Sequence, residues 1–462
     1  MRRRSFIAMG GVSAVAAGLT RGAIAAGEPK AERAGAVGEQ VREPARDLPV
    51  AERGEVVVCG GGPAGVAAAL SAARKGAKTL LLEQHGCLGG IWTAGLLAWL
   101  LDTGNKKGVM AEIIRRLSEC GGRTLTAGGK PTNAYDVEKM KVVLETLCAE
   151  AGVGVRYHTR VAAALTAGGS LTHVVTESKS GREAVSGKVF VDATGDGDLG
   201  AQAGCGFDLG HPDTGLTQPM SLIALVSGLN AGEIKAFYHD LDDEPRTWAA
   251  PKDLLRQAME QGGHSPSYAK PSLFRVCDDL FILMANHEYG FKGHDAREVT
   301  RATLRARREL HALIDGLRGT GGVWQNLRLV ATAEQIGVRE GRRLHGLYTV
   351  RADDLREGRR WDDAVCRATF PVDVHALDPA RTRSIEGHPW RAKPYDIPLR
   401  ALIAREVRGL LFAGRCISGD FFAHASYRVT GNAVALGEAA GRAAAVAAAT
   451  GKALSAVTVA EL

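Results

Sequence analysis

The chain has 462 residues, of which 45% are hydrophobic and 24% are charged, and its formal net charge at pH 7 is +7. These values are typical of a globular protein with two domains, or with one large domain and an insertion, and they exclude a disordered chain and a coiled coil. Part of the basic excess comes from Arg2, Arg3, Arg4 and Arg21, which precede the first acidic residue, Glu28. Because a nucleic-acid-binding protein needs a dense basic stripe in its folded part, we expect no nucleic-acid partner.

Residues 1–25 have the pattern of an export signal. A charged start and the weakly apolar run 6–19 precede a small-residue cleavage site at residues 23–25. The run is shorter than an ordinary membrane span of about 20 residues, so we expect no stable membrane span. The element RRSFI, with Arg3 and Arg4 as the pair, resembles a twin-arginine signal, and an ordinary secretory signal is the alternative. The resemblance implies the twin-arginine export machinery as a partner, export of the folded chain, and a periplasmic or extracellular location.

The cysteines do not have the spacing of a metal site. They stand alone, without a CxxC pair and without His at ligand spacing, so we expect packed thiols and no bound metal. The eight are Cys59, Cys87, Cys120, Cys148, Cys205, Cys277, Cys366 and Cys416.

The hydrophobic pattern predicts a βαβ unit after a polar linker over residues 26–53. The apolar run 56–59, bounded by glycines, is typical of a strand buried on both faces, and a small-residue helix over 63–75 leads to a second strand over 79–83. Further elements are a helix over 137–151, short strands over 153–192, and a charged amphipathic helix over 295–317 followed by a loop, GLRGTGG, from Gly316.

The turn of this βαβ unit contains a GxGxxG motif formed by Gly60, Gly62 and Gly65. The first glycine permits a tight turn, the second allows a pyrophosphate to approach the backbone, and the third allows the helix to pack closely on the strand. Glu83 ends the second strand, where a carboxylate accepts hydrogen bonds from an adenosine ribose. Strand, glycines, helix and acid together predict dinucleotide binding rather than an ordinary glycine turn.

Related segments are dispersed along the chain, whereas an NAD-only domain would complete its site within one contiguous half. They are LGGIWT at 88–93, VDATGDGD at 191–198, the stretch 335–365, YDIPLRALI at 395–403, and the stretch 409–448 with its strand, glycine turn, HASYRVTGN and Ala/Gly-rich helix. This arrangement resembles the FAD-binding domain of the glutathione-reductase type, and more closely the FAD-dependent oxidoreductase family near the fumarate reductase and succinate dehydrogenase flavoproteins.

The resemblance implies an α/β fold with a discontinuous Rossmann-like FAD-binding domain and a mixed α+β substrate or cap domain. The FAD-binding domain would comprise 54–209 and 396–450, the cap 210–395, and a tail 451–462. The implied FAD-contacting residues are Gly60, Gly62, Pro63, Ala64, Gly65, Glu83, Gly89, Gly90, Thr93, Val161, Ala193, Gly195, Asp196, Gly414, Arg415, Gly431 and Asn432. Arg415 departs from the related reductases, which usually have Asp at that place.

Two absences in the sequence restrict the chemistry. No CxxxxC pair follows Gly89 and Gly90, so disulfide exchange is not expected. No second glycine motif for a nicotinamide follows a strand, so electrons would come from the substrate or from a separate carrier. Cys87 lies near the expected pyrophosphate region, where a packed thiol is favoured over a covalent flavin link.

His424, Arg428 and Arg339 are the candidate catalytic residues. The histidine would move a proton while hydride passes to flavin N5, and an arginine would hold a carboxylate or an oxyanion. Structural hydrogen bonding is the alternative for these residues, while His85, His375 and the histidines between 264 and 311 are assigned no function.

The expected function is exchange of hydride between a small polar substrate and FAD, with reoxidation by an external acceptor such as a quinone, a cytochrome or oxygen. Two alternatives remain at this stage. One is a flavoprotein that uses FAD structurally or for a non-redox isomerisation, and the other is a non-catalytic nucleotide-binding protein.

Overall fold

A computed structural model describes residues 43–126, 128–238, 247–387 and 390–462. The expected signal peptide and most of the expected linker lie outside these residues. Residues Leu48–Leu462 form one compact unit. Its helices are α1 (Pro63–Arg74), α2 (Val109–Glu119), α3 (Val137–Glu150), α4 (Asp198–Gln202), α5 (Ala250–Gln261), α6 (Ala296–Gly319), α7 (Ala352–Glu357), α8 (Phe421–Tyr427) and α9 (Thr430–Thr450).

A five-stranded sheet forms the centre of this unit, and every neighbouring pair of its strands is parallel. The side chains of β2 and β10 are buried throughout, as their continuous apolar sequences predict. In spatial order the strands are β19 (Leu410–Phe412), β10 (Val189–Asp192), β2 (Val56–Cys59), β3 (Thr79–Leu82) and β6 (Gly154–Arg156). The predicted βαβ unit β2–α1–β3 is confirmed, and β19 joins the sheet from more than 200 residues further along the chain.

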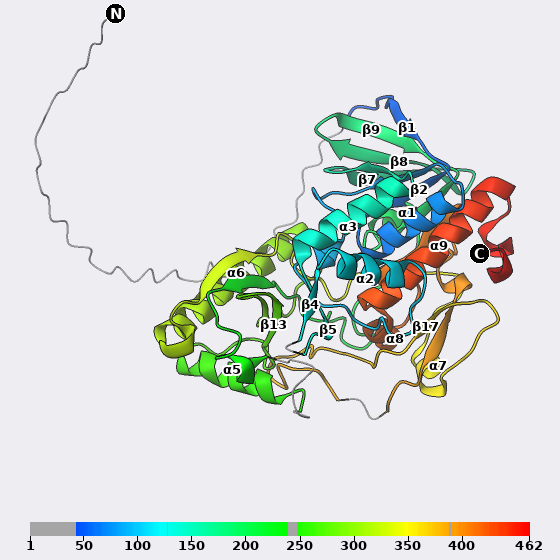
Figure 1. The fold of residues 1–462 in the computed structure, drawn as a ribbon. Coiled ribbons are helices and arrows are strands. Elements are labelled where there is room, and N and C mark those ends of the chain that lie inside the picture. Colours follow the sequence, from blue (N-terminus) through cyan, green and yellow to red (C-terminus); the bar gives the residue numbers. More distant parts are fainter. Residues whose placement is uncertain (1–42, 127, 239–246, 388–389) are drawn as a thin grey trace, which may run out of the picture. The chain divides into compact units, whose positions relative to one another are not determined.

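Helices α1 and α9 lie side by side although they are far apart in the sequence (Figure 1). The contact requires residues without side chains, because a Cβ at Gly437 would overlap the carbonyl oxygen of Ala64 and a Cβ at Gly441 that of Ala68. The Ala/Gly-rich sequence of α9 therefore serves close backbone packing against α1.

A second, four-stranded sheet packs beside the parallel one and has the order β1-β9-β8-β7. Its strands are β1 (Val50–Arg53), β9 (Gly181–Ser186), β8 (Ser170–Ser178) and β7 (Arg160–Ala167). The expectation of a linker up to residue 53 is wrong for residues 50–53, which form β1 and pair in parallel with β9. Only the backbone of β1 needs partners in this pairing, so its mostly exposed side chains carry little hydrophobic signal.

Residues 220–338 build a further layer with its own antiparallel sheet and hydrophobic cluster. The sheet consists of β13 (Ser272–Cys277), β14 (Leu280–Met284), β12 (Ala224–Ser227) and β15 (Arg328–Thr332). Helices α5 and α6 lie beside this sheet, away from α1 and α9 (Figure 1). The loop expected from Gly316 is wrong for its first residues, because α6 continues to Gly319, and a Cβ at Gly316 would press on the backbone of Gly262.

Three short antiparallel pairs complete the strands: β4 (Arg123–Leu125) with β5 (Pro131–Tyr135), β11 (Phe207–Asp208) with β16 (Arg343–Leu344), and β17 (Ala364–Ala368) with β18 (Tyr395–Pro398). The α/β fold class with an additional mixed layer is confirmed. The expected tail packs on this unit, since Leu454 and Val457 are buried and Lys75 Nζ donates to the Glu461 carbonyl at 2.6 Å.

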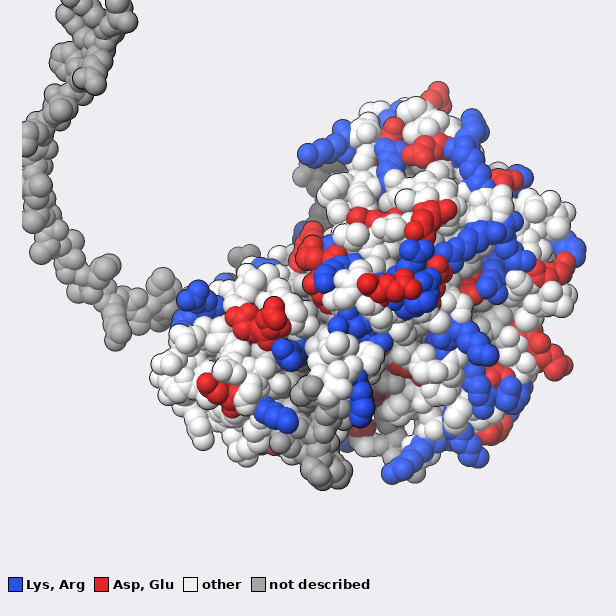
Figure 2. Space-filling view, viewed as in Figure 1, with Lys and Arg blue, Asp and Glu red and all other residues white. Residues whose placement is uncertain are grey.

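On the face seen in Figure 2, basic and acidic side chains are interspersed over the described residues. Among these residues, no helix combines the length and the apolar composition that crossing a membrane requires. The same part of the chain contains no group of three or more His, Cys, Asp and Glu side chains arranged to hold a metal ion.

Candidate active site

A cavity of about 380 Å³ runs from the turn between β2 and α1 to the antiparallel layer. Gly60, Gly62 and Pro63 line one end, and Tyr268 and Arg339 line the other. Glycines, helix starts and the ends of parallel strands meet at the first end, which is the place where α/β sheets bind nucleotides.

The glycine turn has the geometry that the GxGxxG motif predicts. Gly60 has a φ of +100°, and a Cβ there would overlap the carbonyl of Ala193. A Cβ at Gly62 would meet no atom within 4 Å, so the backbone before α1 is open to the cavity. A Cβ at Gly65 would overlap the Gly60 carbonyl, which is how this glycine brings the helix close to the strand. The N–H groups at the start of α1, which has no side-chain cap, can therefore meet a phosphate.

Glu83 lines the cavity with its carboxylate fixed by two backbone donors. The Gly61 N–H donates to Oε2 at 2.6 Å and the His85 N–H donates to Oε1 at 2.7 Å. The side chain is buried, with 4% of the residue exposed. Each oxygen keeps a lone pair that can accept a ribose hydroxyl.

The residues predicted to contact FAD divide into two groups. Those that line the cavity are Gly60, Gly62, Pro63, Ala64, Glu83, Gly90, Val161, Ala193, Gly195, Gly414 and Arg415. Those that do not are Gly65, Gly89, Thr93, Asp196, Gly431 and Asn432. The second group supports the first: Gly89 N–H donates to the Gly61 carbonyl at 2.8 Å, and Thr93 Oγ1 donates to the Leu88 carbonyl at 2.6 Å.

Arg415, which stands where related reductases have Asp, has its charge balanced by a neighbour. Its Nη1 donates to Asp196 Oδ1 at 3.0 Å. Burial raises the pKa of Asp196, and the nearby Arg415 opposes this rise. Arg415 thus lines the cavity as one half of an ion pair, while Asp196 does not reach the cavity wall.

The start of α9 also faces the cavity, through Val429 and Thr430. Thr430 Oγ1 is buried without a hydrogen-bond partner, and the cap residue Val429 offers no side-chain acceptor to the first N–H groups, although that of Gly431 donates to the Leu101 carbonyl at 3.0 Å. Unsatisfied donors at a helix start favour negative charge nearby. The glycine cradle, the fixed Glu83 and this helix start fit the pyrophosphate, the ribose and an electron-rich ring of a flavin dinucleotide.

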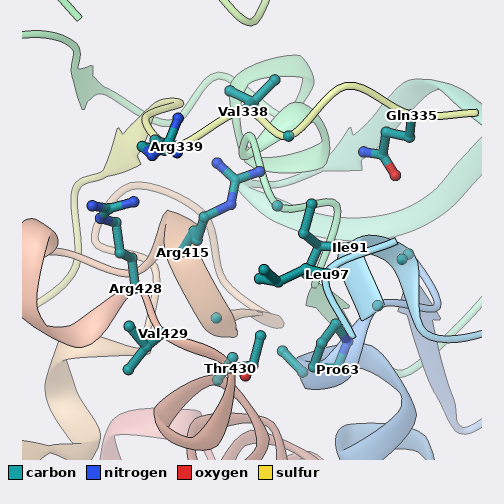
Figure 3. A pocket seen from close by; sticks show the side chains of 18 of the residues that line it. Pro63, Ile91, Leu97, Gln335, Val338, Arg339, Arg415, Arg428, Val429 and Thr430 are labelled. Carbon is teal, nitrogen blue, oxygen red and sulfur yellow. The ribbon is translucent and has the colours of Figure 1, made fainter. Parts of the chain in front are cut away.

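The other end of the cavity contains three arginines with different partners. Figure 3 shows Arg339, Arg415 and Arg428 on one side, with the apolar Ile91 and Leu97 near Arg415. Arg428 Nη2 donates to Asp373 Oδ2 at 3.2 Å and to the Asp373 carbonyl at 2.7 Å.

Arg339 differs from these two because it has no carboxylate partner. Its Nη1 donates to the Pro219 carbonyl at 2.6 Å and to Ser221 Oγ at 2.8 Å. Among the described residues, no carboxylate lies within ion-pair distance of Arg339, and its Nη2 and Nε have no acceptor. Burial and the nearby Arg428 lower the pKa of Arg339 to about 10, so it stays charged at neutral pH.

Of the three arginines in the stretch GVREGRR, only Arg339 lines the cavity. Arg342 pairs with Asp198 at 2.8 Å, and Arg343 forms a buried pair with Glu340 at 2.6 Å. Arg339, a candidate catalytic residue, therefore reaches the cavity, while the function expected for it stays a prediction.

His375 and Asp373 line the cavity as well, although His375 is assigned no function from the sequence and Asp373 is not among the candidate residues. His375 Nε2 lies 3.3 Å from Asp373 Oδ2, and its Nδ1 lies 3.0 Å from His287 Nε2. Burial would raise the pKa of Asp373, but His375, Arg428 and Arg339 hold it below its usual range. Burial and Arg339 lower the pKa of His375 to about 4, so the pair is an anionic carboxylate and a neutral imidazole. The spacing Asp-x-His on an irregular segment was the available signal.

Two further polar side chains complete this end. Tyr268 lines the cavity with a hydroxyl that has no hydrogen-bond partner among the described residues, and burial raises its pKa to about 12. Lys252 of α5 lies 4.3 Å from the centre of the Trp248 ring, and burial lowers its pKa to about 8. Both groups are donors at neutral pH.

His424 is placed differently from the prediction. It is fully buried, does not line the cavity, and neither ring nitrogen has a partner. Burial, with Arg343 and Arg428 nearby, lowers its pKa well below the usual value. Its position in α8 turns the ring into the protein core beside Tyr427, so we assign it no contact with a substrate.

A parallel sheet with a glycine turn and a buried acid at the ends of its strands is typical of a dinucleotide-binding domain. The sequence agrees, because the family model described as FAD dependent oxidoreductase matches residues 55–462. The chain therefore belongs to the FAD-dependent oxidoreductase family, and FAD is its cofactor.

The matches among solved structures include flavoenzymes of low sequence identity. The flavin-dependent brominase Bmp2 is 12% identical over 87% of this chain and 81% of that chain, with a TM-score of 0.48. The myxobacterial chondrochloren halogenase CndH is 14% identical over 87% and 77%, with a TM-score of 0.43. The p-nitrophenol 4-monooxygenase PnpA from Pseudomonas putida DLL-E4 is 14% identical over 64% and 71%, with a TM-score of 0.39. No curated protein matches the sequence.

Proposed function

We propose that this protein exchanges hydride with a small organic anion bound at Arg339, and that an external acceptor, such as a quinone, a cytochrome or oxygen, completes the cycle. The observation that carries the proposal is the guanidinium of Arg339, which lies in the cavity without a carboxylate partner. A partly buried cation with free donors is costly unless an anion joins it. A substrate carboxylate supplies that anion and forms charge-assisted hydrogen bonds to Nη2 and Nε.

FAD would be held by the glycine turn, Glu83 and the starts of α1 and α9, and it supplies a two-electron acceptor or donor. The chain's own residues orient the substrate and move the proton. Arg339 orients the substrate, and the Tyr268 hydroxyl donates a hydrogen bond to a second oxygen. Asp373 accepts the proton that the substrate loses on oxidation, because His375 and Arg428 keep its pKa low and the carboxylate ionised, and because its Oδ1 has no partner among the described residues.

Two alternatives make different demands on the same cavity. An isomerase would turn substrate over without net reduction of the flavin, and a binding protein would do neither. The paired acid–base groups Asp373 and His375 beside an unpaired Arg339 favour catalysis over binding alone.

The test is anaerobic flavin bleaching by matched pairs of compounds. Small hydroxy and saturated carboxylic acids, which can donate hydride to oxidised flavin, are compared with their amides, using wild type, Arg339→Gln, Arg339→Lys and the exposed control Arg297→Gln. We expect bleaching by carboxylates only, with the apparent Kd raised about 10- to 100-fold in Arg339→Gln, because a hydrogen bond to a charged group contributes about 1.5–3 kcal/mol.

Arg339→Lys is expected to recover part of the affinity, and Arg297→Gln all of it. Equal bleaching by the neutral amides, or an Arg339→Gln variant with wild-type affinity, would show that the anion site is wrong. Conversion of a compound while the flavin stays oxidised would favour isomerisation.

We also propose that the chain is exported in the folded state through the twin-arginine pathway. The support is the RRSFI element with its weak apolar run, together with a cavity for the cofactor whose lining residues come from segments far apart in the chain. Changing Arg3 and Arg4 together to Lys is expected to leave the protein in the cytoplasm when cells are fractionated. Mature protein in the periplasm of that variant would identify an ordinary secretory signal instead.

A further inference from the structure

Four side chains form a continuous series of hydrogen-bonding contacts that begins in the cavity. Asp373 Oδ2 lies 3.3 Å from His375 Nε2, His375 Nδ1 lies 3.0 Å from His287 Nε2, and His287 Nδ1 lies 3.1 Å from the Tyr289 hydroxyl. Asp373 and His375 line the cavity, whereas His287 and Tyr289 do not. His287 is buried, and Tyr289 is partly exposed and precedes the exposed Gly290.

The series has one consistent arrangement of protons when Asp373 is ionised. Asp373 accepts from Arg428, so its carboxylate is an acceptor and His375 Nε2 must carry the proton facing it. A neutral His375 then has a bare Nδ1, which must accept from His287 Nε2–H. His287 in turn has a bare Nδ1, which must accept from the Tyr289 hydroxyl. Every donor therefore points toward the cavity.

We propose that Tyr289, His287, His375 and Asp373 form a proton relay between solvent and the cavity. Both histidines are held neutral by burial and by nearby cations, which keeps one bare nitrogen on each ring for a proton to enter. The relay rests on the proposed function in one respect only, which is the identity of the group in the cavity that exchanges a proton with Asp373.

When the relay carries one proton inward, one proton is transferred across each of its three contacts. A proton passes from Tyr289 Oη to His287 Nδ1, from His287 Nε2 to His375 Nδ1, and from His375 Nε2 to Asp373 Oδ2. Solvent returns one proton to Tyr289, so one proton in total enters and neutralises Asp373. Rotation of the carboxylic acid presents it to the cavity, where Oδ1 has no partner among the described residues. The passage leaves both imidazoles in the opposite tautomer, which is the arrangement that carries a proton outward.

The groups around the relay keep charge away from its centre. Tyr268 covers His287 with a ring distance of 4.1 Å, and Arg339 and Arg428 oppose a positive charge on either imidazole. At the outer end, the Ser267 carbonyl lies 3.5 Å from the Tyr289 hydroxyl, farther than the 3.1 Å to His287 Nδ1, so the hydroxyl proton favours the histidine. Ser267 Oγ donates to Glu309 Oε2 at 2.7 Å, and Arg383 lies near Tyr289.

The first measurement is imidazole ¹⁵N NMR of the FAD-bound protein labelled at histidine, from pH 5.5 to 8.5. We expect His287 and His375 to be neutral with the proton on Nε2 throughout. In Tyr289→Phe the donor to His287 Nδ1 is lost, so that nitrogen shifts and the second tautomer becomes populated. An imidazolium at either position, or a proton on Nδ1 of His375 in the wild type, would contradict the relay.

The second measurement follows proton uptake with a pH indicator after rapid photoreduction of bound FAD, which requires at least one proton from solvent. We expect uptake to slow by at least about tenfold in Tyr289→Phe, in line with the size of other acid–base effects, while electron entry is unchanged. The matched control is Tyr157→Phe, whose hydroxyl donates to Glu145 at 2.8 Å outside the relay.

Uptake at the wild-type rate in Tyr289→Phe would mean that protons enter through the cavity mouth, and the relay would be wrong. Neither measurement uses an organic substrate or the anion site. A failure of the relay is therefore distinguishable from a failure of the proposed function.

Discussion

The arginines that line the cavity differ in function according to whether a neighbouring carboxylate neutralises their charge. Arg415 and Arg428 each have a carboxylate partner, Asp196 and Asp373, whereas Arg339 has only neutral acceptors. All three guanidinium groups line one cavity, and only the unmatched one leaves a positive charge for a ligand to neutralise. Together with Lys252, which lines the same cavity and also has no carboxylate within ion-pair distance among the described residues, Arg339 therefore favours an anionic ligand.

His424 provides a prediction for the pH dependence of stability. Its pKa lies well below the unfolded value of 6.5, so below that pH the unfolded chain binds a proton that the folded protein does not. Stability therefore falls as the pH drops below about 6.5, by up to about 1.4 kcal/mol per pH unit for this residue. His424→Leu should fold, because neither ring nitrogen has a partner to lose, and its unfolding free energy between pH 6.5 and 5 should fall less steeply by about that amount.

Denaturant titrations of wild type and His424→Leu at several pH values give the comparison. His287 and His375 also lower the unfolding free energy at acidic pH, because burial lowers the pKa of each, and they do so equally in wild type and His424→Leu. Equal slopes for the two proteins would mean that His424 is protonated in the folded state.

Among the elements, the contact between α1 and α9 determines how the cofactor end of the cavity is built. The N-termini of both helices line the cavity, through Pro63 and Ala64 on α1 and Thr430 on α9. The spacing of the helices depends on Gly437 and Gly441, which leave room for the backbone of α1. A wider spacing would move both helix starts away from the pyrophosphate and the flavin.

Gly441→Ala is expected to lower both stability and FAD retention. The added methyl group would overlap the Ala68 carbonyl, and overpacking of this kind costs about 1–3 kcal/mol. The matched control is Gly319→Ala at the end of α6, where a Cβ meets no atom within 4 Å, and the expected change there is neutral or slightly stabilising. Denaturation and FAD release after gel filtration measure both effects, and equal behaviour of the two variants would rule out the close-packing role.

At the scale of the whole molecule, the cavity draws its walls from the parallel sheet, the antiparallel layer and the returning C-terminal helix. The residues that line the cavity come from segments that are hundreds of residues apart. Cofactor binding should therefore stabilise the folded unit as a whole, because the unfolded chain has no site for it.

Gly62→Val separates cofactor binding from folding. Gly62 has φ −69° and ψ −175°, which valine adopts before proline, and a Cβ there meets no atom within 4 Å. The apoprotein should keep its stability, while the side chain occupies the space of the pyrophosphate. FAD at about 100 times its Kd should add about 2.7 kcal/mol to wild type and nothing to the variant, as measured by denaturation with and without FAD. An equal gain in both proteins would place the pyrophosphate elsewhere.

The sequence by itself determined the local elements of the cofactor end. Strand β2, the glycine turn, helix α1 and Glu83 follow one another within about thirty residues, and each has a pattern that arises from short-range physics: apolar continuity, positive φ, and small side chains. For the same reason β19 and α9 were recognisable from the sequence, although the strand was expected over 409–413 and the helix from Asn432, one or two residues from the observed bounds. Strand β1 was missed because backbone pairing, rather than a buried side-chain pattern, holds it in place.

Only the tertiary structure decided the substrate end. Arg339, His375, Arg428 and Tyr268 come from four separate segments without a shared period, and their function depends on which partners each one meets after folding. His424 shows the converse, because its sequence context resembled a catalytic one while the turn of α8 placed its ring in the core. Charge matching and burial are properties of distances in space, and residues far apart in a chain acquire those distances only when the layers pack together.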